Sequence, residues 1–157
     1  MAPAGSLKIQ PVNFESFQMA MALSTKAVLS TFAPEKRVFL NLATHIAPVC
    51  DCFGMTPIAI LPDVGLFGGD DICAVDQATL DALKELRLIA EHIPESYEVQ
   101  YDLPHPLQQL HGRFKDPYLV VKYGEQLGLG SCAYELIDVM AETAATGELG
   151  AVSAAGL

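Results

Sequence analysis

The feature that most constrains the fold is a long apolar repeat between residues 72 and 92. Apolar or small side chains recur there at the three- and four-residue spacing of one helix face. Asp70 or Asp71 can cap the first turn, and Pro94 follows the last one. We therefore expect a helix over residues 72–92. The residues that carry the repeat are Ile72, Val75, Thr79, Ala82, Leu83, Leu86, Ile89 and Ala90.

Two short apolar segments, residues 37–43 and 58–61, precede this helix. Their bulky side chains predict strands, and strands that are apolar on both faces are typical of a buried parallel sheet. Residues 44–54 between them read as a loop, and the glycines of residues 65–69 indicate a flexible turn before the helix. We expect an α/β fold with a short, mostly parallel sheet and flanking helices.

The remaining segments are shorter. Residues 13–30 repeat with helical spacing behind a possible Asn13 cap, and residues 117–127 predict a helix closed by Gly128. The proline-rich stretch of residues 95–116 reads as an extended excursion. Residues 134–139 alternate and predict a last strand.

The length of the chain, 157 residues, suits a single domain over residues 1–140. Residues 141–157 form an alanine- and glycine-rich tail, which we expect to dock on a partner. About half of the chain is apolar, and charged residues are scarce. Such a composition favours a subunit with surface buried against other protein subunits, or against further copies in a homo-oligomer.

Charge and hydropathy exclude two classes of partner. The formal net charge is −10, and the nine Lys and Arg residues are spread along the chain, so we expect no nucleic-acid partner. No apolar run reaches the roughly 20 residues that span a bilayer. The first residues lack the basic-then-apolar order of a signal peptide, so we expect a cytoplasmic protein with reduced cysteines.

The four cysteines are the main candidates for chemistry. Cys50 and Cys52 flank a single residue in a predicted loop, where both sulfurs can reach one metal. Cys73 begins the predicted helix, where backbone N–H groups favour the thiolate. Cys132 follows a glycine-rich turn. Four thiolates suit a [4Fe–4S] cluster or a structural zinc equally well by ligand count, whereas buried cysteines can also act as small apolar side chains.

Two further interpretations stay open at this stage. His45, five residues before Cys50, is expected to orient the loop through hydrogen bonds, or else to replace one cysteine as a ligand. Carboxylates also gather between residues 63 and 76. Paired carboxylates can act in acid–base catalysis, whereas helix capping explains Asp70 and Asp71 more simply.

Three segments of the chain form a distinctive combination. Residues 45–54 read HIAPVCDCFG, residues 60–67 read ILPDVGLF, and residues 71–78 read DICAVDQA. Together they resemble the DUF362 family of iron–sulfur or ferredoxin-like proteins. Residues 123–130 and 134–137 are similar to the C-terminal part of that family. The resemblance implies that Cys50 and Cys52 bind a cluster. Cys73 stands where the family has proline, and Cys132 where it has another residue.

Members of that family are longer, and their N-terminal half has no counterpart here. A separate subunit could supply that half. The sequence and the resemblance therefore predict a cluster-binding subunit of a larger complex, active in electron transfer or as structural support for a redox enzyme. Its ligands would be Cys50, Cys52, Cys73 and Cys132. The alternatives are a structural zinc-binding module and an enzyme with an acidic site near Asp63 and Asp71.

Overall fold

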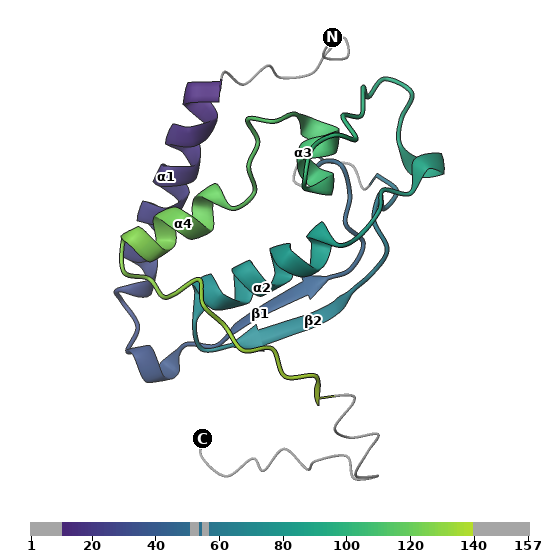
Figure 1. Ribbon diagram of the computed structural model, residues 1–157. Helices are drawn as coiled ribbons and strands as arrows, with labels where there is room; N and C mark the ends of the chain where they lie inside the picture. Colours follow the sequence, from purple (N-terminus) through teal and green to yellow (C-terminus); the bar gives the residue numbers. More distant parts are fainter. Residues whose placement is uncertain (1–10, 51–53, 55–56, 140–157) are drawn as a thin grey trace.

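The computed structural model describes residues 11–50, 54 and 57–139. In chain order that part contains α1 (Pro11–Leu29), β1 (Phe39–Ala43), β2 (Gly65–Gly69), α2 (Ile72–Lys84), α3 (Pro106–His111) and α4 (Leu119–Gln126). Helix α2 lies along one face of the two-stranded sheet, and α1 packs against α4 (Figure 1). This mixed arrangement of helices and strands confirms the coarse fold class.

The sheet is antiparallel, so the prediction of a mostly parallel sheet is wrong. Phe39 pairs with Gly69 at one end of the sheet, and Ala43 pairs with Gly65 at the other. The pairing partner of β1 is the glycine-rich segment expected to be a turn, not residues 58–61. Glycine is favoured in β2 because a Cβ atom on Gly69 would lie 3.0 Å from the Val75 side chain of α2.

Residues 58–61 form no strand, because Ile60 and Leu61 serve the core instead. Both side chains are fully buried, and they cluster with Leu83 of α2 and Leu110 of α3. The Ile60 amide donates to the carbonyl oxygen of Ile46 at 2.8 Å. The apolar character of this segment therefore reflects burial in a loop.

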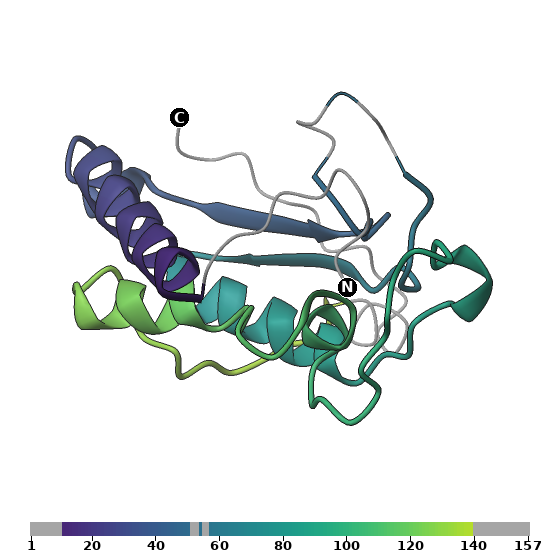
Figure 2. The same cartoon turned by 90° about the horizontal axis from the view of Figure 1, so that it is seen from above.

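The two faces of the sheet have different surroundings. Asn41 projects from β1 toward α2, where its amide donates to the Asp76 carboxylate at 2.8 Å and to the Thr79 hydroxyl at 3.1 Å. The alternate residues Leu40, Leu42 and Leu66 are exposed. Figure 2 shows that α2 and α4 lie on one side of the strands, and no described helix covers the other side.

Helix α2 begins where expected and ends eight residues early, at Lys84. Beyond it, the Ile89 amide donates to the Ile60 carbonyl oxygen at 2.8 Å. Leu86 and Leu88 pack against the buried cluster around Ile60. The apolar repeat continues past the helix because the following loop fills the same core.

Other predictions have mixed outcomes. Helices α1 and α4 lie close to their expected positions, and Gly128 adopts the left-handed conformation expected after α4, with φ of 74°. The excursion over residues 95–116 includes the short helix α3. Residues 134–139 form no strand, so the last predicted strand is wrong, and the predicted tail over residues 141–157 lies outside the described residues. No described helix is long and apolar enough to cross a membrane.

Asp71 joins the start of α2 to the segment after α4. One carboxylate oxygen accepts from the amides of Cys73 at 2.8 Å and Ala74 at 3.1 Å. The other accepts from the Ser131 amide at 2.8 Å. The carboxylate thus caps a helix and also holds a segment sixty residues further along the chain.

We expect Asp71→Ala to lower the free energy of unfolding by about 2 kcal/mol, because it removes a helix cap and a tertiary hydrogen bond together. Urea unfolding followed by circular dichroism measures this. Asp70→Ala is the matched control, since Asp70 is adjacent and exposed, and we expect a change within about 0.5 kcal/mol. Equal losses of unfolding free energy in the two variants would contradict the role of Asp71 in holding the segment after α4 to the start of α2.

Candidate functional site

The loop after β1 carries Cys50 and is fixed by several hydrogen bonds. The His45 amide donates to a carboxylate oxygen of Asp63 at 2.7 Å, and the Val64 amide donates to the Ala43 carbonyl oxygen at 2.9 Å. These bonds fasten the start of the loop to the segment that leads into β2. Asp63 is therefore a structural acceptor for the loop.

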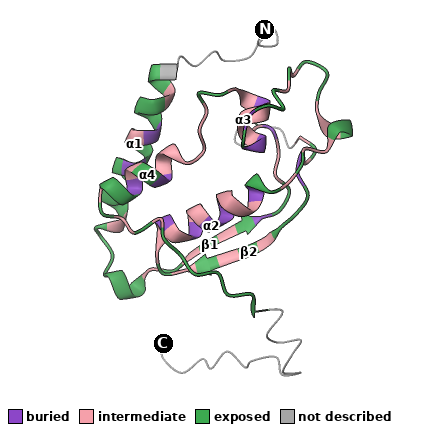
Figure 3. Cartoon of the chain, in the orientation of Figure 1, coloured by how far each residue is buried: buried purple, intermediate pink, exposed green. Residues whose placement is uncertain are grey.

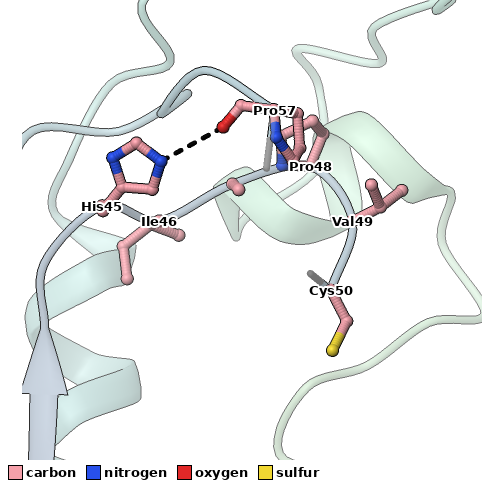
Figure 4. Close-up of a pocket in the computed structure, with 7 residues that line it drawn as sticks. His45, Ile46, Pro48, Val49, Cys50 and Pro57 are labelled. Carbon is pink, nitrogen blue, oxygen red and sulfur yellow. Dashed lines mark hydrogen bonds between the residues drawn. The ribbon is translucent and has the colours of Figure 1, made fainter. Parts of the chain in front are cut away.

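His45 has an unusual backbone conformation, with φ of 51°. Left-handed backbone is uncommon outside glycine, and it turns the imidazole toward the returning chain. The ring atom Nε2 lies 3.1 Å from the Pro57 carbonyl oxygen (Figure 4). A carbonyl oxygen can only accept, so Nε2 carries the proton in this bond. This contact agrees with the expected role of His45 in orienting the loop.

A shallow hollow of about 390 Å³ lies at this loop. Cys50 lies on the rim of this hollow and is an exposed residue. The Cys50 sulfur points away from the His45 ring (Figure 4). Cys52 lies outside the described residues. A cysteine in an exposed loop can contribute to a metal centre. The hollow is lined by His45, Ile46, Ala47, Pro48, Val49, Cys50 and Pro57.

Cys73 and Cys132 both lie beside α4, at the other end of the sheet. Cys73 is buried, and its sulfur is so close to Gly124 of α4 that a Cβ atom there would lie 2.9 Å from it. The Cys132 amide donates to the carboxylate of Glu125, the next residue of α4, at 2.7 Å. Negative charge on Cys132 adds to the causes that raise the pKa of Cys73.

The electrostatic environment opposes thiolate formation at Cys73. Burial is the largest cause, the negative charge of Asp71 is the next, and together with other nearby acidic groups they raise the pKa of the Cys73 thiol to about 12. Burial and the Glu125 carboxylate also raise the pKa of Cys132. The expectation that the start of α2 favours a Cys73 thiolate is wrong, because carboxylates and burial outweigh the backbone dipole.

The described cysteines are thus divided between two places. Cys50 follows the Ala43 end of β1, whereas Cys73 follows the Gly69 end of β2 (Figure 1). Five strand residues span four steps of about 3.3 Å each, so these two ends of the sheet are about 13 Å apart. No group of three metal-binding side chains assembles among the described residues. A single centre that uses Cys50 together with Cys73 and Cys132 of the same copy does not fit this arrangement.

The acidic residues are divided in the same way. Asp63 lies beside the Cys50 loop and accepts from His45, whereas Asp71 caps α2 at the far end of the sheet. Asp76 accepts from Asn41 beneath the sheet. Asp63 and Asp71 therefore do not form the joint acidic site considered from the sequence.

Sequence analysis missed a polar cluster around Asp81 of α2. Its carboxylate accepts from the hydroxyl groups of Tyr118 at 2.8 Å and Tyr134 at 3.0 Å, and from the Gln77 amide. The cluster ties the segment after α4 to α2. Only the helical spacing of Gln77 and Asp81 was visible in the sequence, because both tyrosines come from distant segments.

His111 supports the cysteine loop from α3. Its imidazole bonds to the Pro48 backbone, and Pro48 is a buried residue that lines the hollow. Burial, followed by the charge of Lys115, lowers the pKa of His111 to about 4. The ring is thus kept neutral at physiological pH.

Exposure and pKa predict how the thiols react with iodoacetamide at about pH 8. We expect rapid alkylation of exposed Cys50 in the folded, metal-free protein. Cys73 should react only after unfolding, because it is buried and its raised pKa leaves little thiolate. Peptide mass spectrometry after timed quenching measures both rates. Equal rates for the two cysteines in folded protein would contradict this environment for Cys73.

We also expect acid to weaken the fold through His111. An unfolded histidine titrates near pH 6.5, so the contribution of His111 is complete above that pH and is lost as the pH falls toward 4. The loss amounts to about 2 kcal/mol after allowance for partial exposure. Urea unfolding at a series of pH values measures it. His111→Gln should flatten this dependence, and an unchanged slope would contradict the assignment.

Comparison of the chain with models of protein families, with curated proteins and with solved structures found no match. The resemblance to the DUF362 family therefore stays a prediction. A function can therefore be inferred only from the chemistry of the cysteine loop and from the surfaces around it.

Proposed function

We propose that this chain binds an iron–sulfur cluster at the loop of Cys50 and Cys52 and serves as a subunit of a larger redox complex. The observation that carries the proposal is the position of Cys50. Cys50 is exposed on the rim of a hollow, and hydrogen bonds hold its loop in place. A cysteine in an exposed loop is accessible to an incoming metal, and thiolate is the form that binds it.

The residues around the loop position the ligand without joining the metal themselves. His45 and His111 bond to the backbone of Pro57 and Pro48, which flank the cysteine segment. A bound cluster would supply one-electron transfer. Nearby backbone groups and this fixed loop would tune its sulfurs. The remaining ligands must come from beyond the described residues, because Cys73 and Cys132 lie at the far end of the sheet.

Zinc is the second candidate, because both a cysteine and a histidine line the hollow. His45 lines the same hollow as Cys50, and mixed cysteine and histidine ligands are common in structural zinc sites. A zinc site would serve a binding module with no redox activity. Zinc gives no visible absorption and needs no inorganic sulfide, so analysis of the purified protein separates the two candidates.

The role as a subunit is supported by the apolar surfaces outside the core. Large apolar side chains are exposed on the sheet and along α1. Exposed apolar patches of this kind are typical of surfaces that meet another protein. A cytoplasmic location remains part of the proposal, because it would keep the thiols reduced.

The direct test is iron, zinc and sulfide analysis of the anaerobically purified full chain, with its visible spectrum. We expect iron and sulfide in the wild type and their loss in Cys50→Ser. Cys132→Ser is the matched control, because it makes the same chemical change at the far end of the sheet, and it should keep the metal content of the wild type.

The alternatives give different results. Zinc without sulfide, lost in Cys50→Ser, would favour the zinc module. Full metal content in Cys50→Ser, or its loss in Cys132→Ser with Cys50 intact, would overturn a centre at the loop. Circular dichroism of each variant would distinguish loss of ligand from loss of fold.

A further inference from the structure

The outer face of the sheet, formed by Val38, Leu40, Leu42 and Leu66, is apolar and uncovered in the described structure. Leu40, Leu42 and Leu66 are 59%, 62% and 66% exposed. Strand residues alternate between faces, so these side chains lie opposite the face that α2 covers. Sheets that are apolar on both faces are normally covered on both faces.

A second surface, the α1 stripe of Phe17, Met21 and Val28, is also uncovered. These three side chains follow helical spacing along one side of α1, and each is exposed. Figure 3 shows that much of α1 is exposed. The helix carries only Glu15 and Lys26 as charged residues in 19 positions. A helix so poor in charge is typical of one that is buried on several sides.

The α1 stripe cannot cover the outer sheet face of its own copy, because α1 is braced against α4 near both ends. The Tyr123 hydroxyl donates to the Glu15 carboxylate at 2.8 Å. The Lys26 ammonium group donates to the Leu127 carbonyl oxygen at 2.7 Å. Each copy therefore presents one uncovered sheet face and one uncovered helix stripe.

We infer that two copies of this chain form a two-fold dimer in which the α1 stripe of each copy covers the outer sheet face of the other. A two-fold axis uses both surfaces of both copies at once. Covering the seven side chains of the two surfaces would bury on the order of 700 Å² per copy, close to the roughly 800 Å² per partner of a standard interface. The inference does not depend on the metal centre.

The net charge of the chain also favours contact through the outer sheet face and the α1 stripe. Each chain has a formal net charge of −10, so two copies repel one another over most of their surfaces. None of the seven residues of the two surfaces is charged. Association through them keeps the carboxylates of both copies in water, where repulsion is screened.

Sedimentation velocity of the full chain tests this arrangement. We expect a species of twice the 16.8 kDa chain mass at micromolar concentration. Leu42→Asp on the sheet and Phe17→Asp on α1 should each weaken the dimer by about tenfold or more, because each places a charge in an apolar contact. Tyr101→Asp is the matched control, since Tyr101 is an exposed apolar residue outside both surfaces, and its dimer should be unchanged.

Mixing the two variants makes the test specific. A mixed pair retains one intact contact, between the unchanged α1 of Leu42→Asp and the unchanged sheet of Phe17→Asp, so the mixture should dimerise more strongly than either variant alone. Sheet-to-sheet association gives no such rescue and would overturn the proposal. A monomeric wild type would also overturn it, as would wild type found only in complex with a different protein.

Both substitutions replace exposed side chains, and circular dichroism should show unchanged folding. Leu42→Thr provides a milder second variant, because it removes apolar area without adding a charge and because β-branched threonine suits a strand. It should weaken the dimer less than Leu42→Asp does. A dimer unaffected by all three substitutions would overturn the assignment of these surfaces.

Discussion

The carboxylate of Asp71 holds the described structure together at one end of the sheet. It caps α2 through the amides of Cys73 and Ala74, and it accepts from Ser131 after α4. Because α2 covers the inner face of the sheet, this one side chain fixes how the helices sit on the strands. It also adds negative charge beside Cys73, which makes that thiol a poor thiolate. The same interaction thus supports the fold and keeps the Cys73 thiol protonated at neutral pH in the metal-free protein.

Local patterns were sufficient for the elements that depend on neighbouring residues. The helical spacing of α1, α2 and α4 was visible in the sequence, as were the Asp71 cap of α2 and the apolar strand β1. The predicted Asn13 cap is wrong, because Asn13 lies inside α1. The identity of the second strand was not, because Gly65–Gly69 becomes a strand through pairing with β1 and close contact with α2. The C-terminal end of α2 was not predictable from the sequence either. Leu86 and Leu88 have helical spacing and yet fill the core from a loop.

The direction of the second strand decided how much of the site could be predicted. In a parallel sheet, the loops after both strands would meet at one edge, and Cys50 would lie near Cys73. Antiparallel pairing places these loops at opposite ends. The role of His45 in orienting its loop was predictable from its place beside the cysteines, and it agrees with the bond to Pro57. The separation of the cysteines was not predictable, since it depends on strand pairing rather than on spacing in the chain.

Together these features describe a small α/β unit with the Cys50 loop at one end of the sheet and with Cys73 and Cys132 near the other end. The central claim is that metal binds at the loop end alone. X-ray absorption at the iron edge, on the anaerobically purified Cys73→Ser/Cys132→Ser double variant, tests it most directly. The account predicts iron with sulfur neighbours, as in the wild type. A folded double variant without sulfur-bound iron, prepared beside a wild type that has it, would contradict the account.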